Sequence, residues 1–316
     1  MVLFPIMEDL LVKSNLAPHD IDFLIVNCSG FCSSPSLSSI IVNKFNMRSD
    51  VKTFNLSGMG CSASMLAMTL GQNLLSIHKE SNVVILSTEI LTTGWYAGKE
   101  RPMLVINGLF RMGGAAILLT NRKQAQKGSK YKLAWAVREQ RCFNHKAYNS
   151  AIREEDSNGL TGVTLRKDIL EVASDMIRAQ LTALGSSMLP VTERAKFAIS
   201  VVKKRFLNKA IEIYVPNFKT IVRHYCLPVS GQPVIREIGK GLRLEEREME
   251  AAFATLHRFG NQSSSSLWHE LAYTELTEAK ERVKKGDRVW MLGMGTGPKC
   301  SSVVLECIRP IVGESK

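Results

Sequence analysis

The sequence lacks the cysteine pattern of a disulfide-stabilised protein or a zinc site. Its 316 residues contain seven cysteines, an odd number, with no Cys-x-x-Cys pair and no regular spacing. Disulfide frameworks and structural zinc sites both depend on paired or regularly spaced cysteines. We therefore expect free thiols in a reducing compartment, with no bound metal and no cofactor.

Long apolar runs are also missing. No segment approaches the roughly 18–20 apolar residues that span a bilayer, so we expect no transmembrane segment in this chain. The opening residues, Met1 to Asp9, are too short and too soon acidic for a signal peptide. The chain starts directly on a helical pattern at residues 5–15, and from this abrupt start we expect an N-terminal portion of a larger protein to be missing.

Negative charge is scarce. Lysine and arginine number 41 against 29 aspartate and glutamate residues, a net charge of +12. Such an excess favours an anionic partner: nucleic acid, a membrane surface or a phosphate-bearing metabolite. The basic residues are spread along the chain, aromatic residues do not cluster among them, and none of the usual nucleic-acid-binding motifs is present. We therefore expect no nucleic-acid partner.

Hydrophobic patterning indicates a layered α/β protein. Residues 21–28 and 82–88 are near-continuous apolar runs, typical of strands buried on both faces. Helical patterns at 37–45 and 65–77 alternate with them, which predicts a largely parallel sheet over the first ~120 residues. The second half ends on a strand, a glycine turn and a strand at 289–308, and this indicates a weak internal duplication.

Between these regions the pattern is more polar. Residues 144–161 predict a loop. Residues 165–184 and 191–206 predict amphipathic helices with basic faces, and residues 267–283 predict another helix.

One candidate site is the stretch around Cys61. A strand at 51–56 leads through Gly58 and Gly60 into the helix at 65–77. A cysteine in a sharp strand-to-helix turn lies near free N–H groups and the helix dipole, which lower its pKa and favour the nucleophilic thiolate. The alternative is a buried structural cysteine in a tight turn.

A second candidate is Asn261, in the run Arg-Phe-Gly-Asn-Gln-Ser-Ser-Ser-Ser at 258–266. An amide in a glycine turn before a helix can donate to a developing oxyanion, or it can simply form an Asx turn ahead of a serine cap. His257 lies four residues earlier and fits either proton transfer or helix capping. His224 fits a hydrogen-bonded core histidine better than a catalyst. The remaining histidines are expected to be solvated: His19, His78, His145 and His269.

A glycine turn at 293–297 offers backbone N–H groups to a phosphate, but it lacks the context of a dinucleotide-binding motif.

Several of these stretches together resemble one family. They are Asn-Leu-Ser-Gly-Met-Gly-Cys-Ser-Ala at 55–63, Ser-Thr-Glu at 87–89, Leu-Phe-Arg-Met-Gly-Gly-Ala-Ala at 109–116, and the run at 256–266. The chain resembles, over essentially its whole length, the plant 3-ketoacyl-CoA synthases, the condensing enzymes of very-long-chain fatty acid elongation. The resemblance implies a thiolase-type fold with two similar α/β halves in five layers, α-β-α-β-α.

The resemblance also implies an arrangement of domains. Residues 1–125 are expected to form the half that carries the nucleophile, and residues 126–316 the second half, with a helical cap inserted at about 160–210. The basic helices in that insertion fit a cap over an acyl tunnel with a solvated face. Binding of the same helices to a membrane surface is the alternative.

The chemistry implied is a Cys–His–Asn site. Cys61 matches the family's nucleophile and Asn261 its asparagine, while His224 and His257 are the candidate histidines. Cys61 would accept the acyl group of a long-chain acyl-CoA, and the enolate from malonyl-CoA would attack the acyl-enzyme. The implied partners are a second, identical or related synthase and other elongase subunits, at the cytosolic face of the endoplasmic reticulum.

The sequence departs from the family at two histidines. The family has His-x-Cys-x-His, whose second histidine is catalytic, where this chain has His224-Tyr-Cys-Leu-Pro228. His224 lies about 13 Å along an extended chain from position 228, too far for simple substitution. Gln140 replaces another family histidine. The family's N-terminal membrane helices and first strand are also absent, so we expect a fragment or a shortened member.

Two functional hypotheses follow from these departures. The first is a condensing enzyme whose rate Pro228 lowers severely, because loss of an acid–base or oxyanion group costs roughly 10²–10⁴ in rate. The second is a non-catalytic family member that pairs with active synthases and regulates them.

Overall fold

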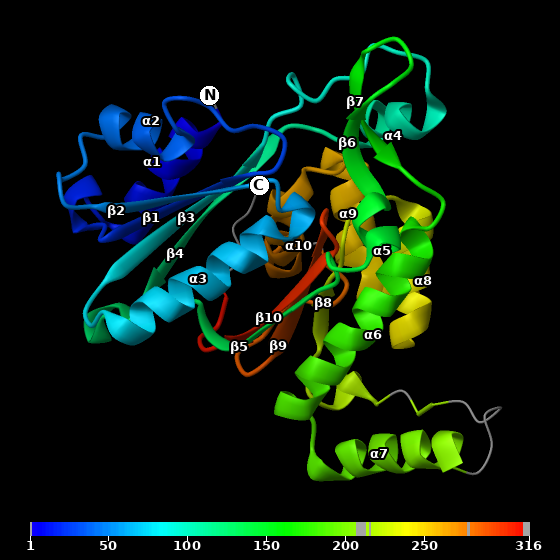
Figure 1. Ribbon diagram of the computed structural model, residues 1–316. Helices are drawn as coiled ribbons and strands as arrows, with labels where there is room; N and C mark the ends of the chain where they lie inside the picture. Colours follow the sequence, from blue (N-terminus) through cyan, green and yellow to red (C-terminus); the bar gives the residue numbers. More distant parts are fainter. Residues whose placement is uncertain (1, 207–212, 215, 277–278, 312–316) are drawn as a thin grey trace.

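The computed structural model describes residues 2–206, 213–214, 216–276 and 279–311. These residues form two four-stranded sheets, a small hairpin and the helices that cover them (Figure 1). The helices are α1 (Leu3–Ser14), α2 (Leu37–Lys44), α3 (Ala63–Ile77), α4 (Arg101–Leu109), α5 (His145–Asn149), α6 (Ile169–Met188), α7 (Val191–Phe206), α8 (Gln232–Leu242), α9 (Glu250–Phe259) and α10 (Ser266–Glu275).

The first sheet has the strand order β2-β1-β3-β4. Its strands are β1 (Phe23–Cys28), β2 (Lys52–Ser57), β3 (Asn82–Glu89) and β4 (Gly113–Thr120). β1 runs parallel to β2 and β3, and β4 runs antiparallel to β3. The predicted largely parallel sheet is therefore confirmed, with β4 as its antiparallel edge.

The second sheet repeats part of this pattern. Its order is β5-β10-β9-β8, and its strands are β5 (Tyr131–Gln140), β8 (His224–Cys226), β9 (Arg288–Gly295) and β10 (Lys299–Cys307). β8 is parallel to β9, and β10 is antiparallel to β9. The trio β8, β9 and β10 thus matches β1, β3 and β4, which supports the internal duplication inferred from the sequence.

Three hydrophobic cores separate five layers. Along β1, Leu24 and Val26 pack outward with α1 and α2, while Phe23 and Ile25 pack inward with α3. The inward face of β9 joins that same central core, which α3 shares with α10. The outward face of β9 packs against α6 and α8. This alternation along each strand produces the α-β-α-β-α order, and the expected thiolase-type architecture is confirmed.

The sequence pattern predicted a loop for the polar stretch at 144–161, and this prediction is wrong. The stretch contains α5 and a hairpin of β6 (Ala151–Glu155) and β7 (Thr161–Leu165). The Tyr96 hydroxyl donates a hydrogen bond of 2.6 Å to Asp156 Oδ2 in the hairpin turn. Contacts from a distant segment therefore stabilise strands that local propensity does not reveal.

Helix α10 is shorter than predicted. It ends at Glu275 instead of continuing to 283, and residues 277–278 lie outside the described part of the chain. The N–H of Val283 donates to the Thr274 carbonyl at 3.0 Å, so the chain has already turned back beside the helix.

The two helices expected in a cap behave differently. α6 buries Met176 and Leu184 in the core that covers the second sheet, and Gln180 Nε2 donates to the Val137 carbonyl of β5 at 2.9 Å. α7 stands away from both sheets (Figure 1). The boundary at 125/126 and the cap at 160–210 stay predictions. No helix among the described residues is long and apolar enough to cross a membrane.

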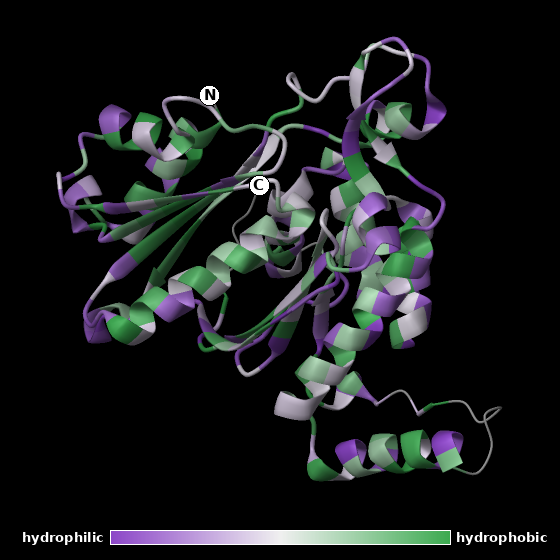
Figure 2. Ribbon diagram, in the orientation of Figure 1, coloured by the Kyte–Doolittle hydropathy of each residue, from purple (hydrophilic) through white to green (hydrophobic). Residues whose placement is uncertain are grey.

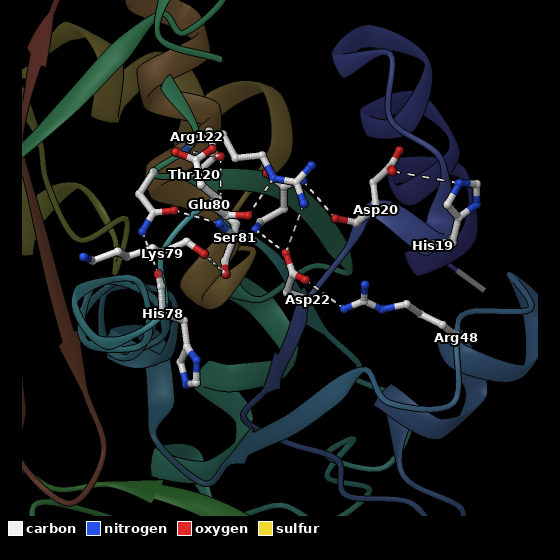
Figure 3. Close-up of polar contacts among 12 residues, drawn as sticks. His19, Asp20, Asp22, Arg48, His78, Lys79, Glu80, Ser81, Thr120 and Arg122 are labelled. Atoms are coloured by element: carbon white, nitrogen blue, oxygen red, sulfur yellow. Dashed lines mark hydrogen bonds and ion pairs between the residues drawn. The ribbon is translucent and has the colours of Figure 1, made fainter. Parts of the chain in front are cut away.

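A polar cluster holds together the end of the first sheet that lies opposite the candidate site. Asp22, just before β1, forms ion pairs with Arg48 at 2.8 Å and Arg122 at 3.5 Å (Figure 3). It also accepts the N–H of Asn82 at the start of β3, at 2.7 Å. These bonds fix the offset of β1 and β3 along the strand direction, and so help to determine where the carboxyl ends of the parallel strands meet.

Candidate active site

Cys61 lies in the predicted strand-to-helix turn. β2 ends at Ser57, a short 3₁₀ turn covers Gly60–Ser62, and α3 follows at once. Gly60 has φ +59°, and a Cβ on it would lie 2.3 Å from the Thr296 backbone nitrogen. The glycine turn after β9 therefore packs directly against the cysteine turn, so its glycines serve close backbone contact.

The thiol of Cys61 is held in its neutral form. Burial, with a smaller contribution from the charge of Glu89, raises its pKa to about 11. The Ser263 hydroxyl, which donates to Cys61 Sγ at 3.4 Å, opposes this shift. The expected depression of the pKa is wrong for this chain, because the loss of hydration outweighs what the turn and the hydroxyl supply.

The backbone of Asn261 is held by hydrogen bonds to the end of α4 and to the chain that follows it. Its N–H donates to the Leu109 carbonyl at 3.0 Å, and its carbonyl accepts the N–H of Arg111 at 2.8 Å. Its side-chain Oδ1 accepts the N–H of Ser263 at 2.8 Å, which is an Asx turn. Its Nδ2 is buried and has no hydrogen-bond partner among the described residues. The Asx turn of Asn261 is therefore confirmed, and because it uses only the oxygen, donation from Nδ2 to an oxyanion stays a prediction.

Ser263 links the two candidate residues. Its hydroxyl contacts Cys61 and its N–H contacts Asn261, while its own backbone is left-handed at φ +57°. A serine seldom adopts this conformation, so the surrounding contacts must hold it there. From the sequence, Ser263 is expected only as part of a serine helix cap. The run of four serines was the available signal.

A buried polar network joins the halves behind this site. Asn27 of β1 donates to Ser87 Oγ at 2.8 Å and accepts from Ser264 Oγ at 2.8 Å. Ser87 in turn donates to Ser64 Oγ at 2.9 Å, and the Trp268 indole N–H also donates to that hydroxyl. Satisfied networks of this kind rigidify their surroundings, so α10 and the serine run are held at a defined position against the first sheet.

The structure does not bring His224 to this site. His224 is buried beside Asp287, with 3.1 Å between Nε2 and Oδ2, and burial lowers its pKa. It pairs with Val289 on β9, whereas the β9 residue that backs onto the Cys61 carbonyl is Gly293. These two positions are four residues apart along β9, about 13 Å.

No hydrogen bond or ion pair among the described residues connects another histidine to Cys61, Ser263 or Asn261. His78, expected to be solvated, is half-buried, with 5.0 Å between its ring centroid and that of Phe23. His257 is exposed in the last turn of α9. His269 is half-buried instead of solvated: its ring packs on Phe259, with 5.0 Å between centroids, and burial lowers its pKa. Among the described residues, no group of three or more His, Cys, Asp or Glu side chains is placed to hold a metal ion.

Pro228 is buried just after β8. It lies two residues beyond Cys226, which pairs with Met291, and so on the side toward Gly293 and the cysteine turn. The preceding N–H, of Leu227, donates to Glu270 Oε2 at 2.7 Å. Burial raises the pKa of Glu270 well above its ordinary value, so burial favours the neutral form of this carboxyl. Its second oxygen has no partner within the described residues.

Known families match nearly the whole chain. A family model described as FAE1/Type III polyketide synthase-like protein matches residues 1–206, and one described as 3-oxoacyl-[acyl-carrier-protein] synthase III C terminal matches residues 220–307. The chain is 47% identical to 3-ketoacyl-CoA synthase 5 of Arabidopsis thaliana, over 98% of this chain and 63% of that protein. It is 45% identical to 3-ketoacyl-CoA synthase 6 of the same plant, over 98% and 62%. The chain thus spans about three-fifths of the length of these relatives.

Solved structures share the fold. The 1,3,6,8-tetrahydroxynaphthalene synthase of Streptomyces coelicolor A3(2), a type III polyketide synthase, matches with a TM-score of 0.75 at 18% identity, over 96% of this chain and 76% of that one. A type III pentaketide synthase from Neurospora crassa matches with a TM-score of 0.72 at 16% identity, over 97% and 78%. These likenesses show the fold alone. The family model matches residues 1–206, well over half of the chain, and the chain therefore belongs to the FAE1/type III polyketide synthase-like family.

Proposed function

We propose that this chain condenses a long-chain acyl-CoA with malonyl-CoA to form a 3-ketoacyl-CoA, at a rate lowered by Pro228. The observation that carries the proposal is the convergence of Cys61, Ser263 and Asn261, with a buried amide Nδ2 that has no partner in the described part of the chain. The 47% identity to a protein named 3-ketoacyl-CoA synthase supports it.

The first step is acyl transfer. The sulfur of Cys61 attacks the thioester carbonyl carbon of the acyl-CoA, a new C–S bond forms, and the CoA thiolate leaves. A neutral thiol must first give up its proton, here to water, and the CoA thiolate takes up a proton after it leaves; the pKa of about 11 makes the first transfer costly at neutral pH. The Ser263 hydroxyl already donates to the sulfur and stabilises the thiolate as it forms.

The second step is decarboxylation and condensation. Malonyl-CoA loses carbon dioxide, and the electron pair of the broken C–C bond forms an enolate. That enolate attacks the acyl carbonyl on Cys61, and the thiolate of Cys61 leaves. The Asn261 amide, held by its Asx turn, is suited to donate to the thioester oxygen that becomes negative.

Pro228 removes a group that both steps need. Proline has no side-chain donor and no backbone N–H. A histidine there would take the proton of Cys61 and then donate to the enolate oxygen. The loss of such a group lowers a rate by roughly 10²–10⁴.

The proline at position 228 also favours a second candidate function. A chain that retains the fold and the Asn27 network but lacks a histidine at position 228 is suited to pair with active synthases and regulate them. We propose in addition that the protein works at the cytosolic face of the endoplasmic reticulum. There it would act as a homodimer or as a heterodimer with a related synthase, together with other elongase subunits. The family resemblance supports these assignments.

The test compares the natural chain with Pro228→His and with Pro228→Ala as a matched control. Alanine removes the proline ring without supplying an imidazole. Each protein is incubated with a long-chain acyl-CoA, and the acyl adduct on Cys61 is measured by mass spectrometry. Malonyl-CoA is then added, and the 3-ketoacyl product is quantified.

We expect the natural chain to form acyl-Cys61 slowly and Pro228→His to condense about 10²-fold faster or more, with Pro228→Ala close to the natural chain. Equal condensation by all three proteins would show that Pro228 does not lower the rate. If the natural chain forms acyl-Cys61 but does not condense it, while Pro228→His does condense it, the regulatory function is favoured. Absence of acyl-Cys61 in all three would overturn the proposal.

A further inference from the structure

One face of α7 exposes a continuous apolar stripe. Its large members are exposed by 54–75%: Val191 69%, Ile199 54%, Val202 54% and Phe206 75%. Ala195 and Ala198, also exposed, fill the positions between them. At 100° per residue these positions share one side of the helix. Figure 2 shows apolar bands along α7 between polar ones.

The opposite face of α7 is occupied, so its orientation is fixed. Glu193 is buried and accepts hydrogen bonds from the Tyr214 hydroxyl at 2.8 Å and the Asn217 N–H at 3.0 Å. Ser200 Oγ accepts the N–H of Tyr214 at 3.0 Å. The apolar stripe therefore points away from Tyr214 and Asn217, the residues to which these bonds attach α7.

Cations border the stripe on both sides. Arg194 and Arg205 lie along one edge of it, and Lys196 and Lys203 lie along the other. All four side chains are exposed. The one acid of the helix, Glu193, faces inward and pairs with Lys196 at 2.8 Å. Arg194, Lys203 and Arg205 therefore supply most of the positive charge of an outer surface that otherwise carries the apolar stripe and the neutral Thr192.

We propose that α7 lies flat on an anionic phospholipid surface, with its apolar stripe at the boundary between headgroups and acyl chains. Sixteen residues make a helix about 24 Å long, and α7 is too charged to cross a bilayer. Its long basic side chains can keep their stems over the apolar stripe while their charges reach the phosphates. A basic face with an apolar stripe is the pattern of interfacial helices.

The charge of the chain argues against a second copy as the occupant. Two α7 faces in contact would bring like charges together, and the whole chain already carries +12. An anionic lipid surface instead complements both the stripe and its borders. The proposal does not depend on the chemistry of Cys61, so it can stand if the proposed function fails.

The first experiment is vesicle co-sedimentation of the full 316-residue chain. One set of vesicles is pure phosphatidylcholine, and the other contains about three-tenths phosphatidylserine. We expect clear binding to the anionic vesicles, with loss of most of it at about 1 M salt, where charges are screened beyond about 3 Å. Equal binding to both compositions would contradict the role of the basic borders.

The second experiment uses two charge-matched double variants. Ile199→Glu with Val202→Glu places acids in the stripe. Val12→Glu with Ile77→Glu places the same acids at exposed positions on α1 and α3, which are 80% and 75% exposed. We expect the partition coefficient to fall about ten-fold or more for the first pair and less than about two-fold for the second. Equal losses would mean that charge alone drives binding and that α7 makes no specific contact.

Two further readouts separate folding and self-association from membrane contact. Ile199→Trp keeps an apolar side chain in the stripe, and its fluorescence should shift to the blue on addition of anionic vesicles, whereas Ile77→Trp should not. An unchanged spectrum at position 199 would overturn the proposal. So would a light-scattering mass that falls from dimer to monomer in the α7 glutamate variant while vesicle binding persists, since a second copy would then cover the stripe.

Discussion

Alkylation of Cys61 offers a direct test of the electrostatics at the candidate site. Only the thiolate reacts with iodoacetamide, so the rate follows the fraction of deprotonated thiol. The structure holds that thiol half-buried, with a pKa of about 11 caused first by burial.

The expected effect is large. At pH 7 a thiol of pKa about 11 is ionised in roughly one molecule in 10⁴, whereas an unperturbed thiol of pKa about 8.5 is ionised in about 3%. Cys61 should therefore present about 300-fold less thiolate than a free thiol, and because a more basic thiolate is about ten-fold more nucleophilic, it should react about 30-fold more slowly before any steric slowing. Its rate should rise about ten-fold per pH unit and level off only near pH 11.

The assay is peptide mapping after short exposure to iodoacetamide at a series of pH values. Cys32 is exposed and reports reagent activity in the same sample. Ser263→Ala removes the hydroxyl that stabilises the thiolate, so the pKa of Cys61 should rise further and the rate at pH 8 should fall.

Two results would refute the reasoning. One is a Cys61 rate that levels off below pH 8. The other is a rate that equals or exceeds that of Cys32 at pH 7. Either would mean that the turn and the helix dipole stabilise the thiolate more than burial penalises it, as the sequence alone suggested.

Three further predictions concern the residues around the site. Gly295→Ala should lower stability by about 1–3 kcal/mol or more and slow acylation, because its Cβ would lie 2.1 Å from the Met59 carbonyl oxygen; a urea midpoint equal to that of the natural chain would contradict this. Glu270 has a raised folded pKa, so its contribution to stability is full below its unfolded pKa of about 4.3 and is lost as pH rises toward the folded value. Glu270→Gln cannot ionise, so between pH 5 and the folded pKa its free energy of unfolding should gain about 1.4 kcal/mol per pH unit relative to that of the natural chain. Urea titrations in which the stability of both proteins depends on pH in the same way would contradict this prediction. Asn27→Leu should lower the free energy of unfolding by about 2–4 kcal/mol, because the buried serine hydroxyls bonded to Asn27 lose partners. A clearly smaller loss, measured by thermal unfolding, would contradict this prediction.

Much of the architecture could be predicted from local sequence. The apolar runs at 21–28 and 82–88 are strands buried on both faces, and the turn that holds Cys61 follows from its glycines and the flanking strand and helix. These features depend on periodicity and backbone freedom, which act over a few residues. The hairpin at 151–165 could not be predicted this way, because its support comes from Tyr96, more than fifty positions earlier.

The candidate site divides in the same manner. The sequence by itself determined the family, the positions of Cys61 and Asn261, and the departure at Pro228. Only the tertiary structure decided that Ser263 bridges the first two, that His224 pairs with Asp287 away from them, and that the Cys61 thiol is neutral. The reason is physical: residue identity and spacing are local, whereas hydration, charge and hydrogen-bond partners at a buried atom are set by every segment that packs around it.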